Sequence, residues 1–350
     1  MRFFRWLFLL MATFALAQDP VPFAPETARP WEPAWELRLR GDRLSGSSED
    51  AFQRAGVQLR LRWTAAWDHF LIVGGTVSTL GSDGNALNAP RWDQQPSNGT
   101  QLDQLNGTFT AASANGFGNL RLGLQDNPLV VSEALWDRDL RFLGAGGGAG
   151  WRSAGGLVQE AGFRGAAGRV RNLLGGEMDL AAGQLVLKLE TGAWSWAAHV
   201  DRWDLTWNAG SERLYPMPGH RGELRQRLRL DAAGLGGTWN APLPLEARWT
   251  GFRNPVTRQD SEEFQLRVGS RERLYWPQVT YTWQRLSSTG TLYPVNGDEW
   301  WFYRGARGPR ADLAVPCPGR WLVTLTVLRQ NADNEAYSVR RVLFTVLKRF

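Results

Sequence analysis

Side chains that could catalyse a reaction or bind a metal are few in this sequence, and they are scattered. The three histidines, His69, His199 and His220, lie far apart with no ligand spacing around them, so a zinc site is not indicated. Asp137-x-Asp139 could supply a general acid and base, but on one strand these carboxylates would only point the same way about 7 Å apart. The sequence has no Gly-x-Ser-x-Gly motif and no phosphate loop. We therefore predict that the protein is no enzyme and has neither metal nor cofactor.

Arginines, in contrast, are abundant and regularly spaced. Within each of three rows the arginines alternate with other residues, so on a strand they project to one face at about 7 Å intervals. The rows are Arg38/Arg40, Arg60/Arg62 and Arg225/Arg227/Arg229. Inside a channel such rows would favour anions. The alternative is that carboxylates balance them and leave little selectivity, the candidates being Asp231, Glu190, Asp201 and Glu263.

These rows belong to segments in which apolar and polar residues alternate with period two, the pattern of a half-buried β-strand. In 54–67 every odd position from Ala55 to Trp67 is apolar, while the even positions carry Arg60 and Arg62. Segment 222–231 repeats the design, with leucines on one face and arginines on the other. The last segment, 338–350, also alternates, and it is long enough to cross about 25 Å of apolar band at a tilt near 45°.

We count sixteen such segments, with fourteen as the alternative count. They are 35–43, 53–67, 70–80, 101–110, 118–125, 137–146, 153–165, 183–191, 194–205, 222–231, 236–252, 262–270, 274–286, 298–315, 320–330 and 338–350. Connections after even-numbered segments are short, whereas 81–100, 166–182 and 206–221 follow odd-numbered ones and are long, the asymmetry of membrane barrels. Closing so many strands into one barrel removes exposed edges and leaves a lumen that holds water. We predict an all-β, transmembrane antiparallel barrel over 35–350.

The start of the chain has the features of an exported protein. Residues 1–17 combine two arginines, an apolar run and Ala15-Leu16-Ala17, which predicts a cleaved signal peptide. Residues 18–34 are rich in proline and predict an extended periplasmic segment. The single cysteine, Cys317, excludes a disulfide within the chain and is predicted to be an inert thiol in a turn. The formal net charge of +6 comes mainly from arginine. We interpret this as a bias of amino-acid composition and not as a sign of a nucleic-acid partner.

One further pattern lies in segment 122–144. It consists of Leu122, Gly123, Asn127, Pro128, Leu135, Trp136, Asp137, Asp139 and Leu140. With these residues the segment resembles a family of outer-membrane porins. The resemblance implies that the third long connection folds into the lumen, where Asp126, Glu133, Asp137 and Asp139 would form a constriction opposite wall arginines. The alternative is that these carboxylates cap turns and pair with Arg138 or Arg141. Lys348 departs from the family pattern, which usually has an apolar or aromatic residue there.

Together these features predict an outer-membrane porin for passive diffusion of small hydrophilic solutes, with a mild anion preference. The resemblance also implies that assembly machinery reads the last strand through Phe350, that the barrel contacts outer-membrane lipid, and that a homotrimer is one arrangement open to the subunits. Tryptophans near strand ends, such as Trp35, Trp67 and Trp321, would form interfacial girdles. Two alternatives remain: a secreted all-β binding protein whose tryptophans stack on sugars, and a barrel with an enzymatic or adhesive role.

Overall fold

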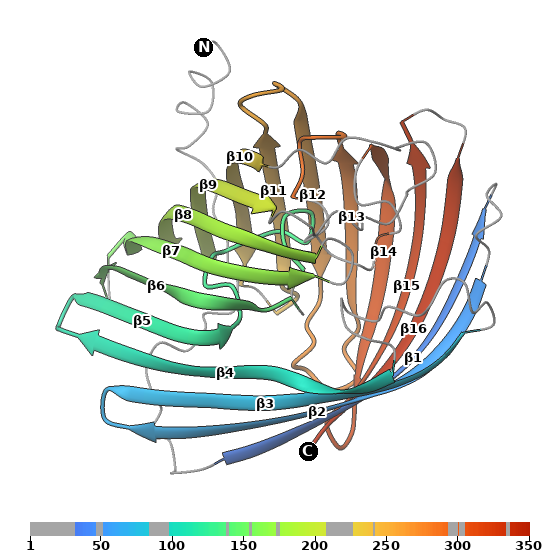
Figure 1. Cartoon of the computed structure of the whole chain (residues 1–350), viewed down its shortest axis with the longest axis horizontal. Helices are drawn as coiled ribbons and strands as arrows, with labels where there is room; N and C mark the ends of the chain where they lie inside the picture. Colours follow the sequence, from blue (N-terminus) through green and yellow to red (C-terminus); the bar gives the residue numbers. More distant parts are fainter. Residues whose placement is uncertain are drawn as a thin grey trace.

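The chain forms one closed β-barrel (Figure 1). The computed structural model describes residues 32–46, 52–83, 98–137, 140–153, 156–172, 176–207, 227–240, 242–292, 300, 305–333 and 337–350. Its strands are β1 Glu32–Gly46, β2 Phe52–Trp67, β3 Phe70–Asp83, β4 Asn98–Ala112, β5 Gly116–Gln125, β6 Phe142–Arg152, β7 Val158–Asn172, β8 Gly176–Thr191, β9 Trp194–Trp207, β10 Arg227–Trp239, β11 Leu245–Arg253, β12 Asp260–Val268, β13 Gln278–Leu286, β14 Ala306–Cys317, β15 Trp321–Ala332 and β16 Ser338–Arg349. Every strand is antiparallel to its sequence neighbours, and β1 pairs with β16. The predicted fold class and the count of sixteen are confirmed, while the predicted signal peptide and most of the proline-rich segment lie outside the described residues.

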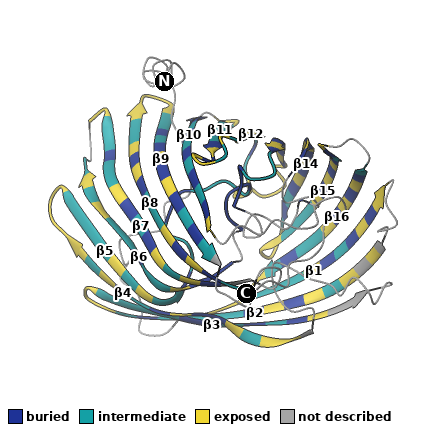
Figure 2. Cartoon of the chain, turned by 45° about the horizontal axis from the view of Figure 1, so that its top comes forward, coloured by how far each residue is buried: buried dark blue, intermediate teal, exposed yellow. Residues whose placement is uncertain are grey.

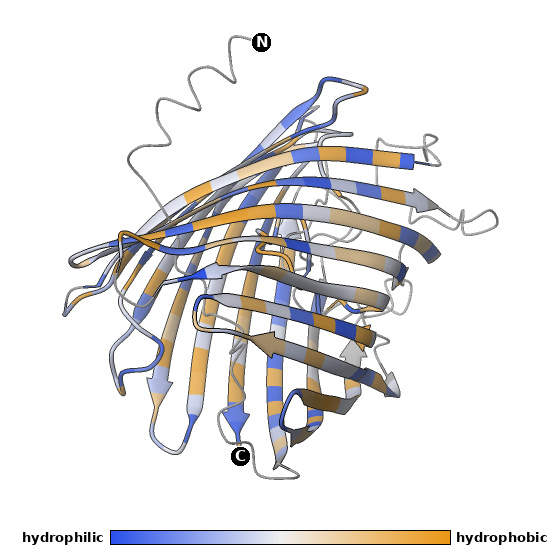
Figure 3. Cartoon of the chain, turned by 90° about the vertical axis from the view of Figure 1, so that its left-hand side faces the viewer, coloured by the Kyte–Doolittle hydropathy of each residue, from blue (hydrophilic) through white to orange (hydrophobic). Residues whose placement is uncertain are grey.

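The two faces of the sheet differ as the period-two pattern requires. On β2, Val57 and Leu59 point outward and are exposed, whereas Gln58 and Arg60 between them point into the barrel and are buried. Figure 3 shows this alternation of apolar and polar residues along the strands. On this strand large apolar side chains face outward and an arginine faces inward, which is the reverse of the arrangement in a soluble protein. Contact of the outer face with the hydrocarbon of a membrane explains this arrangement.

The connections sort to two ends of the barrel. Those after even-numbered strands define the short-turn end, and they are 68–69, 113–115, 153–157, 192–193, 240–244, 269–277 and 318–320. Those after odd-numbered strands define the long-loop end, where 84–97, 126–141, 208–226 and 287–305 are the longest. The first strand begins and the last strand ends at the short-turn end. There the Phe350 amide donates a hydrogen bond to the Trp35 carbonyl at 3.0 Å.

Several predicted strand limits were wrong. The predicted connection 166–182 lies mostly inside β7 and β8, whose glycines did not end the strands because they sit in a fully paired ladder. The predicted turn at 232–235 lies within β10, which runs on to Trp239. The strand predicted from residue 137 begins only at Phe142, because the residues before it belong to the connection 126–141.

Tryptophans ring the outside of the short-turn end. All seven exposed tryptophans of the described residues lie there, namely Trp35, Trp67, Trp151, Trp194, Trp239, Trp276 and Trp321. The Lys348 ammonium lies over the rings of Trp321 and Phe350, at 5.1 and 5.3 Å from their centroids. A lysine at this level lets its charge reach water while its stem covers apolar surface, so the departure from the porin pattern is compatible with a membrane interface.

A buried ion pair closes the seam between the first and last strands. Arg341 of β16 donates to both carboxylate oxygens of Asp42 on β1, at 3.1 and 2.8 Å, and both side chains are essentially without solvent exposure. The pair is bidentate, which fixes the register of two strands that are distant in sequence.

Within the described residues, no helix has the length and apolarity needed to cross a membrane.

Candidate functional site

The connection 126–141, which we call the inner loop, lies inside the barrel. Figure 2 shows it as a largely buried segment between the walls. Leu135 and Trp136 are 0% and 2% exposed, and Trp136 packs on Trp203 of β9 with ring centroids 6.0 Å apart. The loop side chains join one apolar cluster with inward-facing wall residues, which include Met178, Leu205, Leu228, Leu230, Phe252 and Leu286. Burial of these side chains holds the loop against the β8–β13 wall.

Hydrogen bonds fix the loop at defined points of the wall. Gln184 of β8 accepts a hydrogen bond from the Val130 amide at 2.8 Å and donates one to the Val130 carbonyl at 2.7 Å. The same side chain donates to Asp201, whose carboxylate lies 2.5 Å from His199 Nδ1. Because these groups are buried, each bond is difficult to replace by water, and the loop is held rigidly.

The His199–Asp201 pair therefore serves to position the loop. Gly234 makes room for the imidazole, since a Cβ there would lie 1.9 Å from His199 Nε2. Among the described residues, no group of three His, Cys, Asp or Glu side chains is placed to hold a metal ion.

Arg227 and Arg229 of the third predicted arginine row do not line the lumen. Arg225 lies outside the described residues, and Arg227 and Arg229 of β10 point out of the barrel, where both pair with Asp204, Arg229 at 3.1 Å. The prediction that Arg227 and Arg229 line the pore was wrong. The intervening Leu228 and Leu230 point inward instead, because the inner loop offers them an apolar partner that water would not.

The other two rows do face the lumen. Arg38 and Arg40 on β1 and Arg60 and Arg62 on β2 line one cavity of about 460 Å³. The lining of this cavity, which we call the arginine cavity, holds seven arginines and four carboxylates: Arg38, Arg40, Arg60, Arg62, Arg271, Arg310, Arg349, Glu36, Glu133, Asp137 and Asp312. Its formal balance is therefore positive.

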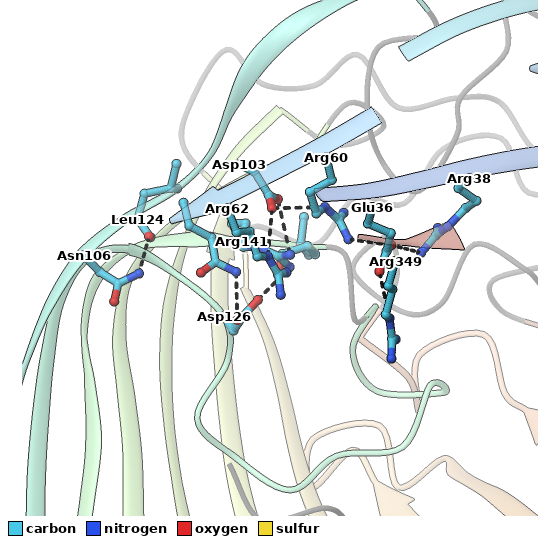
Figure 4. A network of polar contacts seen from close by, with 12 residues as sticks. Glu36, Arg38, Arg60, Arg62, Asp103, Asn106, Leu124, Asp126, Arg141 and Arg349 are labelled. Carbon is cyan, nitrogen blue, oxygen red and sulfur yellow. Dashed lines mark hydrogen bonds and ion pairs between the residues drawn. The ribbon is translucent and has the colours of Figure 1, made fainter. Parts of the chain in front are cut away.

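Asp103 of β4 pairs with two of these arginines and with one arginine of the inner loop (Figure 4). Its carboxylate lies 3.1 Å from Arg60, 3.8 Å from Arg62 and 3.2 Å from Arg141 of the inner loop. The pairing of β3 with β4 shifts register between Gly75 and Thr76, so Asp103 bulges and both it and Gln104 are buried on the inner side. Strict alternation would have put one of these two side chains outside, so the sequence analysis did not find Asp103.

The predicted loop carboxylates divide between two roles. Glu133 lies 2.7 Å from Arg310 of β14, and both Glu133 and Asp137 line the arginine cavity. Asp126 instead pairs with Arg141 at 2.9 Å, the scaffold role that the sequence left open. Asp139 lies outside the described residues.

Further charged residues around the cavity were missed by the sequence analysis. Glu36 lies within 4.0 Å of Arg38, Arg60 and Arg349, the last from the final strand (Figure 4). Glu36 and Arg349 are single charges on the first and last strands, and the closure of β1 on β16 brings these two together. The site can therefore bind or repel charged solutes through a fixed field.

Comparison with known proteins gives the fold. No model of a protein family matches the sequence, and no curated protein sequence matches it either. OmpF of Salmonella typhi, solved in complex with daunomycin, aligns with a TM-score of 0.54 at 11% identity, over 91% of this chain and 97% of that one. OprB of Pseudomonas putida, in a structure at high pH, aligns with a TM-score of 0.59 at 9% identity, over 92% and 94%. Both are outer-membrane porins, so the chain has the barrel fold of that class.

Proposed function

We propose that this chain is an outer-membrane channel through which small hydrophilic solutes diffuse passively, with a mild preference for anions. The observation that carries the proposal is the position of the inner loop, which narrows the lumen of the sixteen-stranded barrel to the arginine cavity. A barrel of this size holds water where side chains do not fill it. Solutes would be sieved by size at the loop and sorted by charge at the arginines.

The charge distribution supports a field across the cavity. Arg38 and Arg40 project from one wall, and Glu133 and Asp137 approach from the inner loop. Charges fixed on opposite sides of a narrow aqueous passage orient dipolar solutes and make entry of apolar ones unfavourable. Since arginines outnumber carboxylates around the cavity, the balance favours anions.

The outer surface supports a membrane location. An exposed apolar band lies beside the tryptophan ring of the short-turn end, as in barrels that cross a bilayer. In our proposal the signal peptide 1–17 directs export, the short-turn end faces the periplasm, and assembly machinery recognises the last strand through Phe350. Cross-linking in native membranes would test whether three copies associate.

The same surface favours a channel over a secreted sugar-binding protein. The exposed tryptophans lie in a ring at one level and outside the barrel, rather than around the arginine cavity. A ring of this kind suits a bilayer interface, whereas sugar stacking would need aromatic side chains gathered at one site.

Liposome swelling tests the proposal with solutes of graded size. The protein should fractionate with outer membranes and require detergent, and liposomes that contain it should admit small sugars faster than large ones. A protein that stays soluble, or liposomes that remain closed to every solute, would contradict the proposed function.

A further inference from the structure

The outer surface of the long-loop end has two sectors of different charge. On β7–β13, each outward arginine whose side chain the structure describes lies beside an outward carboxylate; we call this sector the paired belt. Its ion pairs join Arg169 to Glu177 and Asp179, Arg202 to Asp231, Arg227 and Arg229 to Asp204, Arg253 to Asp260, and Arg285 to Glu262. The charges of this sector are balanced within the protein.

The sector formed by β14, β15, β16 and β1 is different. Each of these adjacent strands carries one exposed, outward-facing arginine near its long-loop end, and together we call them the arginine patch: Arg43, Arg307, Arg329 and Arg340. Arg329 and Arg340 stand directly opposite each other in the β15–β16 ladder. Like charges at opposed positions destabilise a sheet. Within the described part of the chain, Arg43, Arg329 and Arg340 have no carboxylate partner.

The patch lies at the level of a membrane surface. On β15, Arg329 stands eight residues from Trp321 of the tryptophan ring, and on β16 Arg340 stands eight residues from Lys348. Eight residues span about 27 Å along a strand, or about 20 Å along the barrel axis at a tilt of about 40°. The outward-facing residues between them are apolar, among them the exposed Val327 and Val342. Long arginine side chains then reach past an apolar band of about 25 Å to the headgroups on the far side.

We propose that the arginine patch binds the phosphate groups of anionic lipids in the leaflet at the long-loop end. A planar guanidinium matches phosphate oxygens bidentately, and a phosphate between Arg329 and Arg340 would turn a repulsive pair into an attractive site. A second copy of the chain does not fit here in a two-fold contact, because it would bring arginines against arginines. The inference rests on the membrane location proposed above.

Native mass spectrometry of the purified full chain in detergent micelles tests the patch. The probe is dioleoylphosphatidylglycerol, titrated against a background of phosphatidylcholine. The test variant is Arg329→Gln/Arg340→Gln, and the matched control is Arg202→Gln/Arg253→Gln, which removes two outward arginines from the paired belt. Each arginine near an anionic membrane surface strengthens binding about fivefold, so the test variant should bind phosphatidylglycerol roughly 25-fold more weakly.

The control should bind like the wild type, and Arg329→Lys/Arg340→Lys should keep most of the affinity because the charge remains. In detergent micelles with phosphatidylcholine as the sole added lipid, the test variant should be at least as stable as the wild type, since it loses a like-charge pair. Equal loss of lipid in test and control variants, or dimers that depend on the patch, would overturn the inference. If the wild type conducts ions but shows no preference for phosphatidylglycerol, the lipid-binding inference is refuted and the proposed channel function still stands. If the protein does not enter membranes, both are refuted.

Discussion

Replacing Arg38 and Arg40 by glutamine should weaken the anion preference of the channel. The double variant removes two of the seven arginines around the arginine cavity and lowers its formal balance from +3 to +1. An anion about 4 Å from a guanidinium gains about 1 kcal/mol in water, and a Debye length of about 8 Å at 0.15 M salt lowers this to roughly 0.6 kcal/mol. Two arginines then change anion occupancy roughly eightfold.

The assay is the reversal potential of single channels in a potassium chloride gradient, which gives the ratio of chloride to potassium permeability. We expect that ratio to fall in the double variant at 0.15 M salt, by at most about eightfold, and by less at higher salt because screening is stronger. The matched control is Arg227→Gln/Arg229→Gln, which has the same change of charge on the outer face of β10. The reasoning would be refuted if the control shifted as far as the lumen variant, or if the lumen variant kept the wild-type ratio.

Three further substitutions test the loop and the seam. Gln184→Leu removes both hydrogen bonds to the inner loop 126–141, so single-channel current should become larger or noisier; an unchanged current would show that the loop does not depend on this anchor. Trp136→Ala empties the apolar contact of the loop and should cost about 3–5 kcal/mol, measured by urea unfolding in vesicles; a loss below 1 kcal/mol would speak against a packed loop. Asp42→Asn leaves the buried Arg341 without its charged partner and should cost about 3–5 kcal/mol in the same assay, with wild-type stability as the contradicting result.

The strand count and closure could be predicted because both follow from local patterns. Alternation in 54–67 identifies two faces without reference to the rest of the chain, and β2 has those faces. Short connections after even-numbered strands then limit how the strands can be arranged. Strand limits were less predictable, since Gly168 and Gly176 favoured a break in the sheet and instead lie in paired β7 and β8.

The direction of each face was not always predictable. Alternation in β10 separates leucines from arginines but does not say which set points inward. Leu228 and Leu230 turn inward because Trp136 of the inner loop, about a hundred residues earlier, gives them an apolar surface inside the barrel. With the leucines inside, Arg227 and Arg229 must face outward. A contact between distant segments therefore reverses a local rule.

The site was only partly visible in the sequence for a similar reason. The rows Arg38/Arg40 and Arg60/Arg62 were found because, within each row, the arginines occupy alternate positions of a single strand. Asp103 was missed because a bulge changes its side of the sheet, an effect that no single-strand pattern contains. Residues such as Arg310 and Arg349 enter the site only through closure of the barrel.

Single-channel recording with purified protein in planar bilayers tests the central claim most directly. The central claim is that the arginine-lined interior is a continuous path for water and ions, narrowed but not closed by the inner loop. It predicts stepwise increases of conductance as single barrels insert, with chloride carrying more of the current than potassium. A protein that inserts into the bilayer and leaves it electrically silent would contradict the account.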